Sequence, residues 1–408
     1  MEPGTERAIR FAAAVAVSSL VVGVALFSFP DQKSDDTRDF SEFYCAAQMV
    51  RQGLGRNLYD LGVQAKFQSK VASVHAFYLR PPFEALLFLP FTYVSYRAAY
   101  TLWTMAGVGM LIGVALLLDS HTKVRLAVSQ YARVHADFGL LLVIFLTFAP
   151  ATTCLLIGQD SIFMLLIYTL TFVLLKRAAE FQAGCVLALG LFKFHLIVPF
   201  VLILLMRRKW PAAWGFAAVG ILLMLASIGV SGIQALAEYP RVLLFDRTYQ
   251  EITGFASEYS PNIRGVLYLL IHGRFGSLVF GMLVAVFSGL ALWLAARTWR
   301  DEQLGLSFSA AILATLLASY HLYNYDLTLL LLPISIVCGE LARREKLLSS
   351  PTAFSAALVI LFIPPLHRLL LLHGIYALMV IPILGLFWTM LRLTRSAIRD
   401  GDAVEHAV

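Results

Sequence analysis

The segment FQAGCVLALGLFKFHLIVPFVLILLM (residues 181–206) decides how this chain must fold. Its two apolar arms, 178–192 and 196–206, are each shorter than the about 20 residues that a helix needs to cross a bilayer. We therefore expect a helical hairpin whose tip, Lys193, lies below the headgroups of the membrane. A lysine is costly there, by about 2.5 kcal/mol or more at the bilayer centre. It needs an anionic partner or an aqueous cavity, unless its side chain snorkels to the surface.

The whole chain has the composition of a membrane protein. Of its 408 residues, 59% are apolar and only 14% are charged, whereas a soluble domain has about 25% charged residues. In lipid every backbone polar group needs a partner within its own segment, so the apolar runs must be helices. We predict an all-α, polytopic transmembrane helical bundle of about 11–13 helices, forming one domain over residues 1–408. The runs lie at about 11–29, 83–118, 138–150, 161–175, 181–192, 196–206, 211–231, 276–296, 305–319, 327–340, 352–364 and 371–391.

The sequence argues against several other classes of protein. The formal charge of +7 does not indicate nucleic-acid binding, because the basic residues sit in short clusters between apolar runs. The four cysteines lie far apart without a CxxC pair, so we interpret them as small apolar packing residues that support no disulfide or metal claim. No Walker loop, HExxH or GxSxG motif is present. The first run, 11–29, lacks a signal-peptide cleavage site, and we interpret it as a retained first helix.

Basic clusters predict the sidedness of the loops. By the positive-inside rule they face the cytoplasm, so both termini lie inside and the intervening tips point outward. Two outer segments are long: a first extracytoplasmic loop at 30–80, folded against the membrane, and a second at 232–275. The run 83–94 is either a re-entrant helix or an extra crossing, which would invert the loop at 119–137. The clusters are Lys123/Arg125/Arg133, Lys176/Arg177, Arg207/Arg208/Lys209, Arg297/Arg300, Arg343/Arg344/Lys346 and Arg392/Arg395/Arg399.

One carboxylate in the first outer loop is the candidate for a general base. Asp39 lies in RDFSEFYCAA (residues 38–47), at the start of an amphipathic helix. An aspartate there can simply cap the helix. If the loop is folded over an outer cavity, however, Asp39 can accept a proton from a hydroxyl group of a substrate.

Several cationic and polar side chains are predicted at the outer tips of the hairpins, on the same side of the membrane as Asp39. Such a group of side chains suits an anionic, lipid-linked substrate with a phosphate leaving group, because arginine and lysine bind phosphate oxygens. Plainer alternatives stay open: His321 can be a satisfied structural residue, and Asn262 and Arg264 can cap a helix. The candidates are Lys193, Arg264, His321, His195 and Arg80, with Gln159, Asn262 and Asp326 beside them.

The order of the motifs resembles glycosyltransferase family 87, a bacterial membrane family with the GT-C fold. Its type members are mycobacterial polyprenyl-phosphate-mannose-dependent alpha-mannosyltransferases. The resemblance covers nearly the whole chain, but Asp160 stands where the family usually has asparagine or a small residue, and Ile263 where the pattern begins Asn-Gln-Ser. The matching motifs are Asp39-Phe40…Tyr44…Ala46-Ala47, Leu58-Tyr59-Asp60, Pro81-Pro82-Phe83…Leu87-Phe88…Pro90, Ala98…Leu102-Trp103, Gly158-Gln159, Gly190…Lys193 with Pro199, Asn262…Arg264-Gly265 and His321…Tyr325-Asp326 with Pro333.

The resemblance implies a membrane enzyme that moves a hexose, mannose in the type members, from a polyprenyl-phosphate sugar to a lipid or glycan acceptor. It implies inverting transfer on the extracytoplasmic face of a bacterial inner membrane, with no cofactor and no required metal. Asp39 matches the family's catalytic carboxylate, and Tyr44 falls in the same motif. The alternative is a polytopic transporter or lipid flippase, which should show inverted repeats and charges near the midplane. The sequence shows neither feature.

Overall fold

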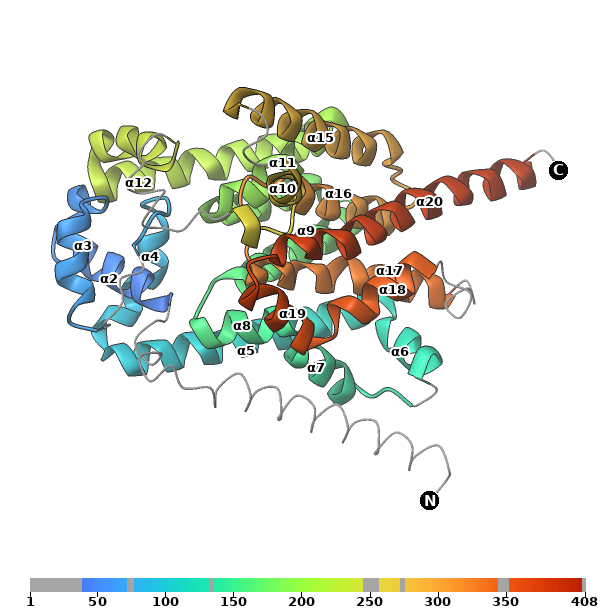
Figure 1. The fold of residues 1–408 in the computed structure, drawn as a ribbon, viewed down its shortest axis with the longest axis horizontal. Coiled ribbons are helices and arrows are strands. Elements are labelled where there is room, and N and C mark those ends of the chain that lie inside the picture. Colours follow the sequence, from blue (N-terminus) through green and yellow to red (C-terminus); the bar gives the residue numbers. More distant parts are fainter. Residues whose placement is uncertain are drawn as a thin grey trace, which may run out of the picture.

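The computed structural model describes residues 39–71, 77–132, 135–244, 257–271, 276–343 and 352–405. Within these ranges the chain is helical and has no strand, and its long helices run roughly side by side (Figure 1). The predicted all-α polytopic fold is therefore confirmed. The predicted first helix, 11–29, lies outside the described residues.

The helices follow one another with short connections. The N-terminal part contains α2 (Phe40–Arg51), η2 (Gly55–Asn57), α3 (Leu61–Gln68), α4 (Glu84–Phe88), η3 (Leu89–Tyr93), α5 (Tyr96–Thr122) and α6 (Val124–Ala132). The central part contains α7 (Phe138–Thr147), α8 (Ala149–Ile157), α9 (Ser161–Lys176), α10 (Glu180–Ala188), η4 (Leu189–Lys193), α11 (Phe194–Met206) and α12 (Trp210–Leu244). The C-terminal part contains η5 (Ser257–Tyr259), α14 (Ile263–Ile271), α15 (Ser277–Thr298), α16 (Leu304–Ala318), η6 (Asn324–Leu330), α17 (Leu331–Arg343), α18 (Thr352–Leu361), α19 (Pro364–Leu372), η7 (Tyr376–Met379) and α20 (Val380–Glu405).

The bundle has two polar ends. At the first, which we name the site end, Ser161 at the start of α9 contacts Lys193 and Asp326. At the second, the basic end, Lys176 at the other end of α9 donates to the carbonyl oxygen of His121 over 2.7 Å. Figure 1 shows α2, α3 and α4 at one extreme of the molecule and the C-terminus of α20 at the other.

Residues 180–206 form the expected hairpin. The stretch Glu180–Met206 has 27 residues and is apolar enough to cross a membrane once. A straight helix of that length would measure about 40 Å. Lys209 Nζ, three residues beyond it, nevertheless lies 2.8 Å from Glu180 Oε1, so the two ends meet. The chain reverses at Lys193, whose backbone angles (φ −113°, ψ 62°) are not helical.

The run 83–94 does not cross the membrane. It forms only α4 and η3, which pack on α2: the rings of Phe43 and Phe88 stack with centroids 4.6 Å apart. α5 then starts at the site end, where Trp103 Nε1 donates to the carbonyl oxygen of Gly158. It ends at Thr122 at the basic end, so the loop at 119–137 keeps the orientation that its basic residues predict.

The lengths of the helices support many crossings. Six stretches are long and apolar enough to span a membrane, or eight if each of two bent helix pairs counts as one span. The bent pairs are α7 with α8 and α18 with α19, and α9 and α16 are apolar but shorter. When the arms of the hairpin are counted separately and the shorter helices are included, the described residues reach the lower limit of the predicted 11–13.

A glycine contact between α10 and α12 yields a stability prediction. A Cβ on Gly215 of α12 would lie 2.0 Å from the carbonyl oxygen of Phe181, which belongs to the backbone of α10 and cannot easily move. Gly229, on the same helix, has no atom within 4 Å of such a Cβ. We expect Gly215→Ala to destabilise the protein by about 1–3 kcal/mol through overpacking. Gly229→Ala should leave stability unchanged or higher, because alanine favours helix. Thermal unfolding in detergent checks this, and equal melting temperatures would contradict it.

Candidate active site

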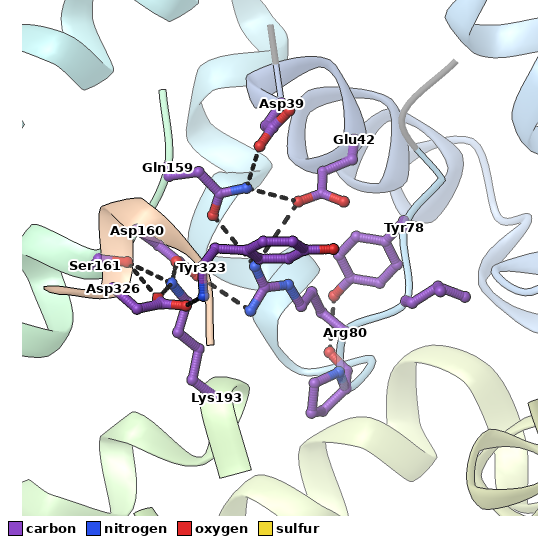
Figure 2. A network of polar contacts seen from close by, with 12 residues as sticks. Asp39, Glu42, Tyr78, Arg80, Gln159, Asp160, Ser161, Lys193, Tyr323 and Asp326 are labelled. Atoms are coloured by element: carbon purple, nitrogen blue, oxygen red, sulfur yellow. Dashed lines mark hydrogen bonds and ion pairs between the residues drawn. The ribbon is translucent and has the colours of Figure 1, made fainter. Parts of the chain in front are cut away.

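Asp39 lies at the start of α2 but does not cap it. Its side chain makes no capping hydrogen bond. Instead its Oδ2 accepts a hydrogen bond of 2.7 Å from Gln159 Nε2, across 120 residues of sequence. The simple cap interpretation of Asp39 is therefore wrong, and the carboxylate points toward the bundle (Figure 2).

The position of Gln159 depends on the glycine before it. Gly158 ends α8 with a left-handed backbone (φ 74°), which side chains rarely adopt. A Cβ on Gly158 would also lie 2.6 Å from Cβ of Phe40, the residue after Asp39. This close approach brings the α8–α9 turn against the start of α2. A glycine is needed before Gln159 because a side chain at position 158 would collide with Phe40.

Arg80 occupies the centre of the polar network in Figure 2. Its Nη2 donates to Gln159 Oε1 over 3.2 Å, so Gln159 bridges Asp39 and Arg80. The guanidinium also forms an ion pair of 3.9 Å with Asp160 Oδ2, and it lies 3.9 Å from Glu42 Oε1. The segment before α4 holds the arginine in place, because Tyr59 Oη donates to its carbonyl oxygen over 2.9 Å.

Lys193 is neutralised by carboxylates. Its Nζ lies 2.7 Å from Asp160 Oδ1 and 2.7 Å from Asp326 Oδ1, and it donates to Ser161 Oγ over 2.6 Å. The lysine and both aspartate side chains are at most 1% exposed. Of the alternatives left open by the sequence, the structure has the anionic partner, rather than the aqueous cavity or snorkelling. Asp326 was among the residues predicted from the sequence, whereas Asp160 had no predicted role.

The network is closed on one side and open on the other. The Lys193 group is buried, whereas the side chains of Arg80 and Glu42 are 15% and 11% exposed, and Asp39 is half-buried. A substrate reaching this end would therefore meet Asp39 and Arg80 first. Lys193 would act on it only through Asp160.

Acids outnumber bases in this network. Its carboxyls are Asp39, Glu42, Asp160 and Asp326, with Glu84 of α4 close by, and its cations are Arg80 and Lys193. Burial raises the pKa of Glu42 to about 8, although Arg80 acts in the opposite direction. Burial likewise raises the pKa of Glu84 well above its usual range. Both are therefore neutral at pH 7, which removes most of the excess negative charge.

Burial also shifts the pKa of Asp39. Burial raises it above 3.8, while the hydrogen bond from Gln159 and the charge of Arg80 favour the ionised form. The raised pKa makes this carboxylate a stronger base than an exposed aspartate.

Two histidines lie beside the network. The ring centroids of His195 and His321 are 5.7 Å apart, and that of His321 is 4.0 Å from the ring of Tyr323. The pKa of Tyr323 is raised by burial and by the carboxylates of Asp39 and Asp326, which places this phenol within their electrostatic reach. Nε2 of His195 is buried and has no hydrogen-bond partner within the described ranges.

The remaining candidates are farther from the carboxylates. Asn262 is structural: its Oδ1 accepts from Gly265 N at the start of α14 and its Nδ2 donates to Ser319 O, as the capping alternative predicted. Arg264 donates to Tyr320 O, beside His321, and lies over the Tyr320 ring at 4.3 Å. Tyr44 lies outside the network, and its hydroxyl donates to Val94 O.

Five residues of this region were not predicted from the sequence: Glu42, Glu84, Asp160, Ser161 and Tyr323. Signals for some of them existed. Glu84 is a single acid at the start of the apolar run 83–94, and Asp160 follows the Gly-Gln pair at a predicted tip. Among the described residues, no group of three or more His, Cys, Asp or Glu side chains is arranged to hold a metal ion.

The buried lysine yields a second stability prediction. Lys193→Met would leave two carboxylates buried without their cation, and we expect a loss of about 3–5 kcal/mol. Lys209→Met is the matched control, because Lys209 also contacts two carboxylates but in a more exposed position. It should cost about 1 kcal/mol or less. Unfolding of both variants in detergent compares them, and equal losses would refute the special role of Lys193.

Comparison with known proteins identifies the family of the chain. A sequence model of glycosyltransferase family 87 matches residues 78–322, more than half of the chain. The matched range includes Arg80, Gln159, Lys193 and His321. No curated protein and no solved structure matched the chain. The chain is thus a multi-pass membrane glycosyltransferase, and it belongs to glycosyltransferase family 87.

Proposed function

We propose that this enzyme transfers a hexose from a polyprenyl-phosphate sugar to a lipid or glycan acceptor at the site end, with Asp39 as the general base. The observation that carries the proposal is the half-buried carboxylate of Asp39, held by Gln159 beside Arg80 at one end of a membrane bundle. Mannose is the sugar that the family resemblance favours.

In the proposed reaction, Asp39 accepts the proton of an acceptor hydroxyl group. The hydroxyl oxygen attacks the anomeric carbon, and the bond from that carbon to the phosphate oxygen breaks. A single displacement of this kind inverts the anomeric centre. The hydrogen bond from Gln159 fixes the direction of the carboxylate, and such positioning contributes to catalysis by reducing the entropy of approach.

The leaving phosphate gains negative charge and needs cations. Arg80 is the best placed, since it is partly exposed and lies one hydrogen-bonded residue from Asp39. Arg264 and the two histidines would supply further donors, and Arg264 forms no ion pair among the described residues. Stabilisation of developing charge by fixed donors is usually what lowers the barrier most in such reactions. Lys193 contributes by holding Asp160 and Asp326 rather than by direct contact.

The side of the membrane follows from charge. Described members of the basic clusters, such as Lys176, Lys209 and Arg343, lie at the end opposite Asp39, and the positive-inside rule assigns this end to the cytoplasm. The site end would then be extracytoplasmic, where nucleotide sugars are not available and a lipid-linked donor is the reasonable substrate. We infer the inner membrane of a bacterium from the family resemblance.

The role of Asp39 can be tested by removing its basicity. We expect Asp39→Asn to lower the rate of sugar transfer about 10²–10⁴-fold, because asparagine keeps the shape but cannot accept the proton. Proteoliposomes supplied with a polyprenyl-phosphate hexose provide the assay. Asp60→Asn is the control, because Asp60 caps α3 through Val63 N and asparagine caps equally well. Activity of Asp39→Asn near that of the wild type would exclude the proposed role.

The pH dependence tests the same network. Asp39 must be ionised to act, so kcat/KM should fall as the pH decreases through its raised pKa, which lies above 3.8. Glu42 ionises at a pH of about 8, adding negative charge beside the leaving phosphate, so the rate should also fall above that pH. In Glu42→Gln the alkaline decrease should disappear while the acidic one remains. A profile identical to that of the wild type would contradict this assignment.

A further inference from the structure

A cavity lies at the basic end of the bundle, far from Asp39. It has a volume of about 570 Å³ and is lined by the ends of α5, α9 and α17 and by the starts of α10 and α16. The 16 residues of α9 separate it from the candidate active site, which corresponds to about 24 Å. Ligand pockets typically have volumes of about 300–1,000 Å³.

One wall of this cavity is cationic. It presents Lys176 and Arg343, both exposed. Arg343 pairs with Glu340 of its own helix. Lys176 Nζ donates to the carbonyl oxygen of His121 and has no carboxylate within ion-pair distance in the part of the chain that the structure describes. Two cations therefore share one acid, and this wall attracts an anion.

Negatively charged carboxylates predominate on another wall of the cavity. Lys209 is shared between Glu180 and Asp301, at 2.8 and 2.9 Å. Glu302 adds a third carboxylate, which is exposed. The buried Oε1 of Gln303 also lines the cavity and lacks a hydrogen-bond donor within the described ranges. This wall attracts a cation that can donate hydrogen bonds.

We propose that the cavity binds the headgroup of a zwitterionic phospholipid, a phosphodiester that carries an ammonium group. The phosphate lies against Lys176 and Arg343, and the ammonium lies against Glu302 and Gln303. An ammonium group supplies the donors that the acidic wall lacks, and charge-assisted hydrogen bonds form at both ends of the ligand. The proposal does not depend on the chemistry assigned to Asp39.

The position of the cavity favours a lipid over a water-soluble phosphate ester. Lys176 ends an apolar helix, which is the usual place for a lysine at headgroup level. The buried rings of Phe172 and Trp299 lie behind the polar lining of the same cavity. Bulk lipid at the membrane surface also presents its headgroup there at high local concentration.

The test measures lipid retention by the full-length protein. The protein is purified in detergent and offered phosphatidylethanolamine or phosphatidylglycerol with identical acyl chains, and bound lipid is measured by native mass spectrometry. We expect the ethanolamine lipid to bind more tightly. Lys176→Gln should weaken its binding about tenfold, the usual scale for one charge-assisted hydrogen bond. Glu302→Gln, at an exposed position in a turn, should abolish the preference between the two lipids.

Arg177→Gln is the matched control. Arg177 is the next residue along the chain and is exposed, but it does not line the cavity. The Arg177→Gln variant should bind the ethanolamine lipid like the wild type. Thermal unfolding verifies that all variants are folded. Equal binding by Lys176→Gln and Arg177→Gln would overturn the proposal, as would equal binding of the two lipids by the wild type. Full competition by soluble phosphoethanolamine would overturn the lipid assignment in favour of a water-soluble ligand.

Discussion

The ion pairs of Lys193 with Asp160 and Asp326 organise the site end of this protein. They join three turns that are remote in sequence: the α8–α9 turn, the tip of the α10–α11 hairpin and the segment that leads into α17. In a bilayer none of these charges is tolerable alone, so each turn is stable only when the other two are in place. The requirement fixes the relative height of three helical hairpins.

Gln159 extends this constraint to the N-terminal helices. It lies next to Asp160 in the sequence, so its position is set by the buried lysine on one side. Its amide then donates to Asp39 and accepts from Arg80 on the other. An uncharged amide can make both contacts without adding charge to a region that is already rich in carboxyls. The buried ionic group thus positions the carboxylate that we propose as the general base.

The two ends of the bundle use charge differently. At the site end, burial keeps Glu42 and Glu84 neutral, and the remaining carboxylates are held by two cations. At the basic end the charges are more exposed and form separate pairs around a cavity. The buried end is suited to bond chemistry, where fixed charges act strongly in a low dielectric. The exposed end is suited to reversible binding of a headgroup.

Several features could be predicted from the sequence: the fold class, the hairpin at 181–206, the separation of basic clusters from polar tips and the need of Lys193 for a partner. These follow from hydropathy and length, which are local properties that the bilayer imposes on every segment. Tertiary structure alone decided which acids pair with Lys193 and that the run 83–94 stays at the site end. It also decided that Asp39 faces Gln159 instead of capping α2, and that Asn262 is a cap. Those choices depend on how separate turns meet in three dimensions, across 120 residues for Asp39 and Gln159 and 133 for Lys193 and Asp326, and neither periodicity nor composition contains that information.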